Sequence, residues 1–197
     1  MTDFFTADWN LNHYNIIKYC NRPFTSTDEM NETLIENCNA RVKEDDRLFF
    51  VGGFLFGPLS DEKFLRTARY FRRKINCRNI FLVFGNHDRR ARKAKTFRQM
   101  FVNTSDYLEI LSGDTSIILT HYPIEEGCWN RCRNGAWHLH GHTHGKTPST
   151  KSKRLDVGVD NLAKYGNYSP EAYRPFSLAE LSEYILSDQT VDSQPPA

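Results

Sequence analysis

The sequence lacks any apolar run long enough to cross a membrane. Its longest run of apolar residues, from Leu48 to Leu59, has 12 residues, whereas a membrane-spanning helix needs about 20. The amino terminus carries Asp3 where a secretory signal would carry basic residues, and no apolar stretch of signal length follows it. We therefore expect a protein without a membrane span, located in the cytoplasm.

The sequence lacks a pairing pattern among its cysteines. The five cysteines, an odd number, stand at positions 20, 38, 77, 128 and 132, and no two of them form a Cys-x-x-Cys motif. This pattern suits reduced thiols better than a disulfide framework. Cys128 and Cys132 are the nearest pair, and a metal or redox role for them stays open as the less favoured alternative.

A strong overall charge is absent as well. The net charge is +2, and hydrophobic residues make up 39% of the chain, whereas a disordered chain has few hydrophobic residues and a high net charge. At 197 residues the chain fits one globular domain, which we place at residues 1–187. The polar tail at residues 188–197 is predicted to be disordered.

The charge that is present is distributed unevenly. The segment Lys63–Arg98 contains thirteen basic residues and one acidic residue, Asp88, so its net charge is +12. The remaining 13 basic and 23 acidic residues give the rest of the chain a charge of −10. A like-charged block is most often a solvated helix face, but a concentrated positive field also attracts phosphate-bearing ligands. Both interpretations stay open at this point.

Strands and helices are predicted to alternate in the first half of the chain, as in an α/β domain. Apolar and aromatic runs predict strands at residues 3–7, 48–51 and 80–84. Helices between them are predicted to begin at Ser26 or Thr27 and at Ser60, residue types that cap helix amino termini. A basic stretch at residues 90–101 is predicted to be helical.

The second half of the chain is richer in strand patterns. Strands are predicted at residues 107–111, 116–120, 136–140 and 155–159, and Ser177 is expected to cap a final short helix. The crowding of these strands predicts a second β-sheet.

Six of the seven histidines lie between residues 87 and 144, and several directly follow predicted strands. Strand ends meet at one edge of an α/β sheet, which is where such folds bind ligands. Imidazole nitrogens together with carboxylate and carbonyl oxygens suit ions such as Zn, Mn or Fe. A single histidine would more often be a structural residue, but the cluster favours a metal site.

Five blocks of the sequence, in this order, resemble the calcineurin-like metallophosphoesterases, especially their small bacterial and phage members. The blocks are Asp8-Trp9-Asn10, Val51-Gly52-Gly53, Gly85-Asn86-His87-Asp88, His121 and Gly141-His142-Thr143-His144. The resemblance implies an α/β fold of two facing mixed β-sheets flanked by helices. It also implies one or two divalent transition metal ions (Mn, Fe, Zn or Ni) that bind a phosphate ester.

The same resemblance implies which residues hold the ions. Asp8 and His144 would bind one ion, and the other would be bound by Asn86, His121 and His142.

The resemblance further assigns the residues that would act on the phosphate. His87 would face it, as a proton donor to the leaving oxygen or a stabiliser of developing charge, and Asp88 would orient the His87 ring. The residues that follow this turn include guanidinium groups, which pair well with phosphate oxygens. We expect phosphate contacts from Arg89, Arg90 and Arg92.

Two positions depart from the family pattern. Asn10 stands where the family has histidine, and Gly53 stands where the family has the aspartate that bridges both ions. Only Asp8 then remains as a carboxylate of the metal-binding motifs, so two divalent ions would repel each other with little compensation. An amide oxygen of Asn10 is a weaker ligand than imidazole. Other donors are available in the sequence: His13, His140, Asp156 and Asp160.

Two functions from different classes remain. The first is a metal-dependent phosphoesterase, with phosphodiesters preferred, whose metal site is altered and weakened; the presence of His87 and Asp88 favours it. The second is a catalytically silent protein of the same fold that binds a phosphate ligand or a protein, which Gly53 favours. A nucleotide or a nucleic-acid end suits the basic segment as substrate, no membrane partner is expected, and no pattern specifies an oligomeric state.

Overall fold

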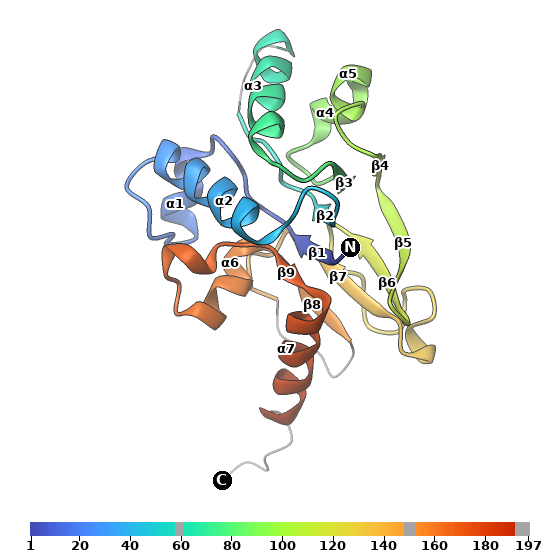
Figure 1. Cartoon of the computed structure of the whole chain (residues 1–197). Coiled ribbons are helices and arrows are strands. Elements are labelled where there is room, and N and C mark those ends of the chain that lie inside the picture. The colour runs from blue at the N-terminus through green and yellow to red at the C-terminus, as the bar shows by residue number, and fades with distance from the viewer. Residues whose placement is uncertain (58–60, 148–152, 192–197) are drawn as a thin grey trace.

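The computed structural model describes residues 1–57, 61–147 and 153–191, and two β-sheets lie at its centre (Figure 1). The first sheet has the strand order β4-β3-β2-β1-β9, with strands β1 (Asp3–Thr6), β2 (Arg47–Val51), β3 (Asn79–Val83), β4 (Asn103–Ser105) and β9 (Phe176–Ser177). The second has the order β5-β6-β7-β8, with strands β5 (Tyr107–Ser112), β6 (Thr115–Thr120), β7 (Trp137–His140) and β8 (Arg154–Asp156).

Both sheets are mixed. Strand β9 runs antiparallel to β1, and β5 runs antiparallel to β6, whereas the other neighbouring strands pair in parallel. The predicted fold class, an α/β domain with two mixed sheets flanked by helices, is confirmed. The parallel strands matter for function, because their carboxyl ends meet at one edge of each sheet.

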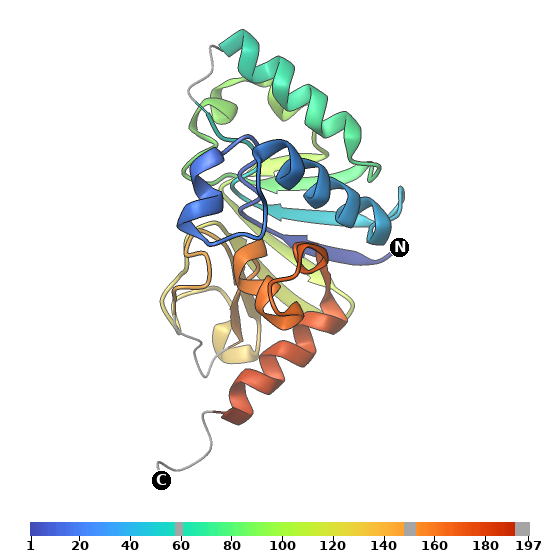
Figure 2. The same cartoon turned by 90° about the vertical axis from the view of Figure 1, so that its left-hand side faces the viewer.

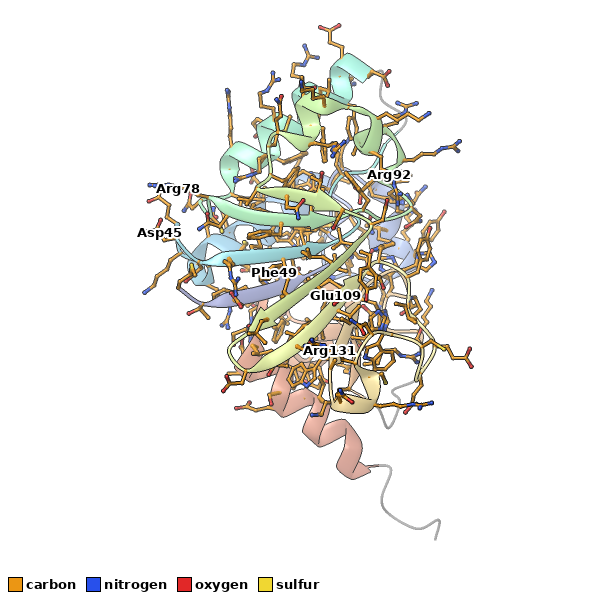
Figure 3. All side chains as sticks on the ribbon, turned by 90° about the vertical axis from the view of Figure 1, so that its right-hand side faces the viewer. Asp45, Phe49, Arg78, Arg92, Glu109 and Arg131 are labelled. Carbon is orange, nitrogen blue, oxygen red and sulfur yellow. The ribbon has the colours of Figure 1, made fainter. Side chains whose placement is uncertain are left out.

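Alternate side chains of the first sheet pack into two different cores. Phe5 and Phe49 stack with ring centroids 5.3 Å apart and belong to the same apolar cluster as Ile117 and Leu119 of the second sheet. Figure 3 looks onto this side of the molecule, with Phe49 labelled on β2. Burial of each such side chain contributes about 1.5–3 kcal/mol, which holds the two sheets face to face.

Helices α2 (Thr27–Arg41) and α3 (Asp61–Lys74) cover the other face of the first sheet. Ser26 caps α2 as predicted, because its hydroxyl accepts a hydrogen bond from the amide of Glu29 at 3.1 Å. Ser60, the expected cap of α3, lies outside the described residues.

The remaining helices are mostly short, namely α1 (Tyr14–Tyr19), α4 (Arg89–Lys93), α5 (Lys95–Arg98), α6 (Val159–Leu162) and α7 (Leu178–Val191), with 3-10 turns at Cys132–Asn134, Ala163–Gly166 and Pro170–Ala172. Helices α3, α4 and α5 gather at one end of the molecule, and α7 lies at the opposite end (Figures 1 and 2). Within the described residues, no helix combines the length and apolar character needed to cross a bilayer.

Several predicted boundaries need correction. The strand expected at 155–159 ends at Asp156, because Asp156 Oδ1 accepts a hydrogen bond from the amide of Gly158 at 2.7 Å and turns the chain. The helix expected at 90–101 is divided at Ala94, whose backbone is extended. The tail expected from residue 188 is helical in α7 as far as Val191, and residues 192–197 lie outside the described part.

Candidate metal centre

The candidate site lies where the loops after several strands converge. Asp8 comes shortly after β1, Gly53 after β2, Asn86 after β3, His121 after β6 and His142 after β7. The backbone amide of His142 donates to Asp8 Oδ2 at 2.7 Å, which ties a loop of the second sheet to a loop of the first. The structure therefore brings together motif residues that lie more than a hundred positions apart in the sequence.

The carboxylate of Asp8 is buried between these loops. Burial raises the pKa of Asp8 to about 7, which means that the protein alone compensates its negative charge poorly. Its second oxygen, Oδ1, lies 2.8 Å from the point where a Cβ atom on Gly53 would stand. A cation beside this oxygen would supply the missing positive charge.

The side-chain amide of Asn10 points into the same space. Asn10 Oδ1 lies 3.1 Å from the same Cβ position on Gly53. Among the described residues no hydrogen-bond donor reaches this buried oxygen, which costs about 1–3 kcal/mol. A cation that reached both this oxygen and Asp8 Oδ1 would be a partner for the two together, so these residues fit a metal ion.

Gly53 itself is required by the conformation of its loop. Its φ is +71°, and its amide donates to Asp88 Oδ2 at 3.0 Å. A Cβ atom at this position would also lie 2.9 Å from the Cα atom of Asp8. The backbone therefore leaves no room for the aspartate that the family pattern has here.

His121 is held as the tautomer that a metal ligand needs. Its Nδ1 lies 2.9 Å from the carbonyl oxygen of Val51, and because a carbonyl only accepts, Nδ1 carries the proton. Burial lowers the pKa of His121, so the ring is neutral near pH 7 and Nε2 keeps a lone pair. Nε2 faces the side-chain amide of Asn86, whose Oδ1 lies 2.7 Å away. Whichever way this amide is turned, Nε2 is the nitrogen that can bind an ion.

His142 lies next to His121. The two ring centroids are 5.2 Å apart, and the ring of Tyr122 lies 4.6 Å from that of His142. Burial, followed by the charge of His121, lowers the pKa of His142. Both rings are therefore neutral at physiological pH, which is the form that coordinates metals.

His144 is oriented by a buried carboxylate. Its Nδ1 lies 2.6 Å from Asp160 Oδ2, and a carboxylate in this position fixes the ring, so that an ion could bind Nε2 once that nitrogen has lost its proton. Burial alone would lower the pKa of His144, but the hydrogen bonds with Asp160 and Cys20 raise it to about 10. Cys20, His144 and Asp160 offer ligand atoms that all lie within 4.8 Å of one another.

Asp160 is in turn held by Arg22. The guanidinium of Arg22 donates to both carboxylate oxygens at 2.7 Å and also donates to the backbone carbonyl of Asp8 at 2.7 Å. Burial would raise the pKa of Asp160, but the charge of Arg22 lowers it to about 2. A single buried arginine therefore positions both the loop of Asp8 and the carboxylate behind His144.

The side chains of His87 and Asp88, the proposed acid–base pair, contact different neighbours. The ring of His87 is half-buried and packs edge-on against Phe56, at 4.9 Å, and His13, at 6.0 Å. Asp88 Oδ2 accepts from the amides of Gly85 at 2.8 Å and Gly53 at 3.0 Å. The carboxylate of Asp88 thus braces two loop backbones, and its role in orienting the His87 ring stays a prediction.

The other donors considered from the sequence have structural partners. His13 accepts from the amide of Ile16 at 3.2 Å and caps α1. His140 Nδ1 lies 2.9 Å from the carbonyl of Gly141. Asp156 Oδ2 accepts from the hydroxyl of Thr143 at 2.6 Å and braces the loop that carries the last two histidines.

No model of a known protein family matches the chain. The chain is 33% identical over 193 residues to the uncharacterized protein MJ1445 of Methanocaldococcus jannaschii, and the match covers 94% of this chain and 92% of that protein. The chain belongs to the MJ1445 family.

Solved structures are similar at lower sequence identity. A protein of unknown function, AQ665 from Aquifex aeolicus, has a TM-score of 0.66 at 20% identity, covers 93% of this chain and 98% of its own, and so shares the fold. A novel archaeal phosphodiesterase has a TM-score of 0.49 at 18% identity, covering 84% and 87% of the two chains. The phosphoesterase Yfce from E. coli has 0.43 at 15% identity, covering 81% and 79%. TM-scores below 0.5 do not decide a fold.

In this member of the MJ1445 family, the three arginines expected to bind phosphate differ from one another. Arg89 and Arg90 are exposed and line a hollow between α3 and α4. Arg92 instead forms an ion pair with Asp106 and lies over the ring of Phe84. Arg92 is therefore engaged within the fold, whereas the other two are open to a ligand.

The MJ1445-family chain also contains site residues that the sequence reasoning missed. Arg22 and Cys20 lie outside the five sequence blocks and were not assigned to the site. A fully buried arginine is rare without a carboxylate partner. Its partner, Asp160, lies 138 residues away in the sequence, and no sequence pattern predicts that these two residues pair.

Proposed function

We propose that the chain is a phosphoesterase that hydrolyses phosphodiesters with a divalent transition metal ion. One observation carries the proposal: Asn10 Oδ1 is buried without a hydrogen-bond donor among the described residues, and it lies at the same edge of the sheets as Asp8 Oδ1 and the lone pair of His121 Nε2. Mn, Fe, Zn and Ni take mixed sets of imidazole nitrogens with carboxylate and amide oxygens. The site thus has the donor chemistry of such an ion.

The two donor sets differ in strength. Asn86, His121 and His142 would hold the first ion, with an open position left for substrate. Asp8 and His144, helped by the amide of Asn10, would hold a second one. Because Gly53 brings no bridging carboxylate, each pair of unit charges on two ions about 4 Å apart is worth about 4 kcal/mol of repulsion at an effective dielectric of 20. We expect well under two equivalents of metal, with the first site filled first.

A bound ion would supply Lewis-acid polarisation of the phosphoryl oxygens. In the hydrolysis, water adds to phosphorus, the bond from phosphorus to the leaving oxygen breaks, and that oxygen ends with a proton. His87 is proposed to face the leaving oxygen. Burial, followed by the charge of His121, lowers the pKa of His87, so its neutral ring would donate an N–H hydrogen bond to the developing negative charge.

Metal content and hydrolysis test the proposal together. The purified protein should hold up to one tightly bound ion by elemental analysis and should hydrolyse bis(p-nitrophenyl) phosphate when Mn is added. Asn86→Ala should lower both the metal content and the rate, because it removes an exposed ligand without opening the core. Asn130→Ala, which removes an exposed asparagine that bonds to Glu109, is the matched control and should change neither. Wild-type protein with no metal affinity and no hydrolysis would refute the proposal.

A second candidate function is a module that binds a phosphate ligand without hydrolysing it. The closed space above Gly53 favours this alternative, because a bridging carboxylate on residue 53 would require the loop of Asp8 to shift. Calorimetry with inorganic phosphate separates the two candidates. Phosphate binding that requires the ion, in a protein that leaves the diester intact, would support the module.

A further inference from the structure

Helices α3, α4 and α5 carry most of the positive charge of segment Lys63–Arg98 and lie together at one end of the molecule (Figure 1). Two hollows lie in this surface. The first, of about 560 Å³, is lined by residues of α3, α4 and α5, and the second, of about 510 Å³, by residues of α5 and β4. Lys93 lines both, so the hollows adjoin. We name their shared set of cations the basic strip: Arg89, Arg90, Lys93, Lys95 and Arg98.

The charges of the basic strip are not neutralised by the fold. All five side chains are exposed, and within the described part of the chain none of them forms an ion pair. Two other cations of the segment Lys63–Arg98 are used differently: Arg92 pairs with Asp106, and Arg78 pairs with Glu44. Of the described residues that line the two hollows, Asp61 is the one carboxylate. The strip thus presents an excess of positive charge to solvent.

We propose that the basic strip binds single-stranded nucleic acid. Five cations along two adjoining hollows match a ligand with a regular row of negative charges, and guanidinium groups pair with phosphate in a two-pronged way. A flexible single strand can enter successive hollows. A duplex is a stiff rod and an acidic membrane is a flat surface, so neither can follow the strip through both hollows.

The hollows also offer partners for bases and sugars. Phe64 and Leu65 line the first hollow and give it an apolar wall. Gln99, Asn103 and Thr104 line the second and present amide and hydroxyl groups. A strand that places its phosphates on the strip would therefore meet both apolar and hydrogen-bonding surfaces, which is how single strands are held without strong sequence preference.

The strip begins beside the candidate metal centre. Arg89 directly follows Asp88, in the turn that carries His87. A strand on the strip would thus pass the residues that we assign to phosphodiester hydrolysis. The binding itself does not depend on that reaction and is tested without metal.

Fluorescence anisotropy with a labelled oligonucleotide of about 20 nucleotides, in EDTA, tests the proposal. If all five cations contact phosphates, log K should fall with log salt with a slope of about −3.5, so affinity should drop roughly 100-fold between about 50 mM and about 200 mM salt. The triple variant Arg89→Gln/Arg90→Gln/Lys93→Gln should reduce the slope to about −1.4.

A charge-matched control separates the strip from general charge. Lys18→Gln/Lys43→Gln/Arg133→Gln removes three exposed cations outside the strip and should keep a slope close to that of wild type. Equal weakening by both triple variants, or binding insensitive to salt, would overturn the proposal. Tight binding to vesicles of phosphatidylserine and phosphatidylcholine, with none to the oligonucleotide, would overturn it in favour of a membrane.

A second variant separates this proposal from the proposed function. Lys95→Gln/Arg98→Gln changes only the hollow that lies away from the metal centre. It should weaken oligonucleotide binding while the hydrolysis of bis(p-nitrophenyl) phosphate stays unchanged. Strip binding in a protein that hydrolyses nothing would leave this proposal standing and refute the phosphoesterase.

Discussion

The substitution Gly53→Ala measures how far the loop under the metal centre depends on glycine. At φ +71° a residue with a Cβ atom is strained, by about 1–2 kcal/mol. The new Cβ would lie 2.8 Å from Asp8 Oδ1 and 2.9 Å from Asp8 Cα, and forcing such contacts costs about 1–3 kcal/mol more. We expect a total loss of about 2–5 kcal/mol in the free energy of unfolding, a large part of the stability of an ordinary domain.

Gly113→Ala isolates the crowding from the backbone strain. Gly113 also has a positive φ, +54°, but no atom lies within 4 Å of its Cβ position. Urea unfolding followed by circular dichroism should therefore show a loss of about 1–2 kcal/mol for Gly113→Ala and a clearly larger one for Gly53→Ala. Equal losses would refute the reasoning, because they would mean that the loop of Asp8 moves away from a side chain without cost.

The same geometry limits a restoration of the family pattern. Gly53→Asp carries the same Cβ atom as the alanine variant, so the gained carboxylate must displace the backbone of Asp8. In the double variant with Asn10→His, we expect the two changes to be coupled because they act on one cluster. Elemental analysis should show a second ion only if the double variant stays folded. A double variant that gains the ion at wild-type stability would contradict the closed space above Gly53.

Three further predictions concern the rest of the fold. Arg22→Met should destabilise the protein by about 3–5 kcal/mol in urea, because it removes the guanidinium that bonds to both oxygens of the buried Asp160 and leaves this carboxylate with His144 alone. Arg78→Met breaks an exposed ion pair with Glu44 and should cost less than about 1 kcal/mol; equal losses would contradict this. Burial lowers the pKa of His138 to about 3, so the unfolded chain binds the proton first: stability from this group is full above its unfolded pKa of about 6.5 and falls by about 2 kcal/mol from about pH 7 to about pH 5. His138→Phe should flatten that dependence in pH-resolved unfolding, and an unchanged slope would refute the assignment. Cys128 is the exposed thiol and should react first with a thiol reagent, as peptide mapping would show.

The sequence predicts strands correctly where the strand is fully buried and its residues form a continuous apolar run. The runs at 48–51 and 80–84 match β2 and β3 within one residue, because strands buried on both faces are continuously apolar. Strand β4 was missed since its residues, Asn103–Ser105, are polar and lie at a sheet edge. Strand β9 was missed because its two residues become a strand only through pairing with β1.

The sequence predicts the candidate metal ligands, but it does not predict the residues that hold them in position. Histidines after apolar runs identify the edge of the sheets, because parallel strands end there. The buried Arg22 and its partner Asp160 join segments 138 residues apart. Local sequence patterns carry no information about a pairing over that separation. The closed space above Gly53 depends on backbone angles, which the sequence does not reveal. The sequence therefore indicates only a missing ligand, whereas the structure shows Gly53 packed closely against Asp8.

The backbone angles of two candidate ligands, His142 and His144, bear on whether the site can bind a metal ion. His142 and His144 have φ of +73° and +49°, a left-handed conformation that costs a residue with a side chain about 1–2 kcal/mol. Non-glycine residues in this conformation persist only where their surroundings hold them, and they concentrate at functional sites. Here the amide of His142 bonds to Asp8, and Asp160 fixes the His144 ring. Because the His142 backbone and the His144 imidazole are already fixed, an ion that binds these residues incurs less of the entropy loss of ordering them. This preorganisation favours retention of metal binding even though Gly53 contributes no ligand.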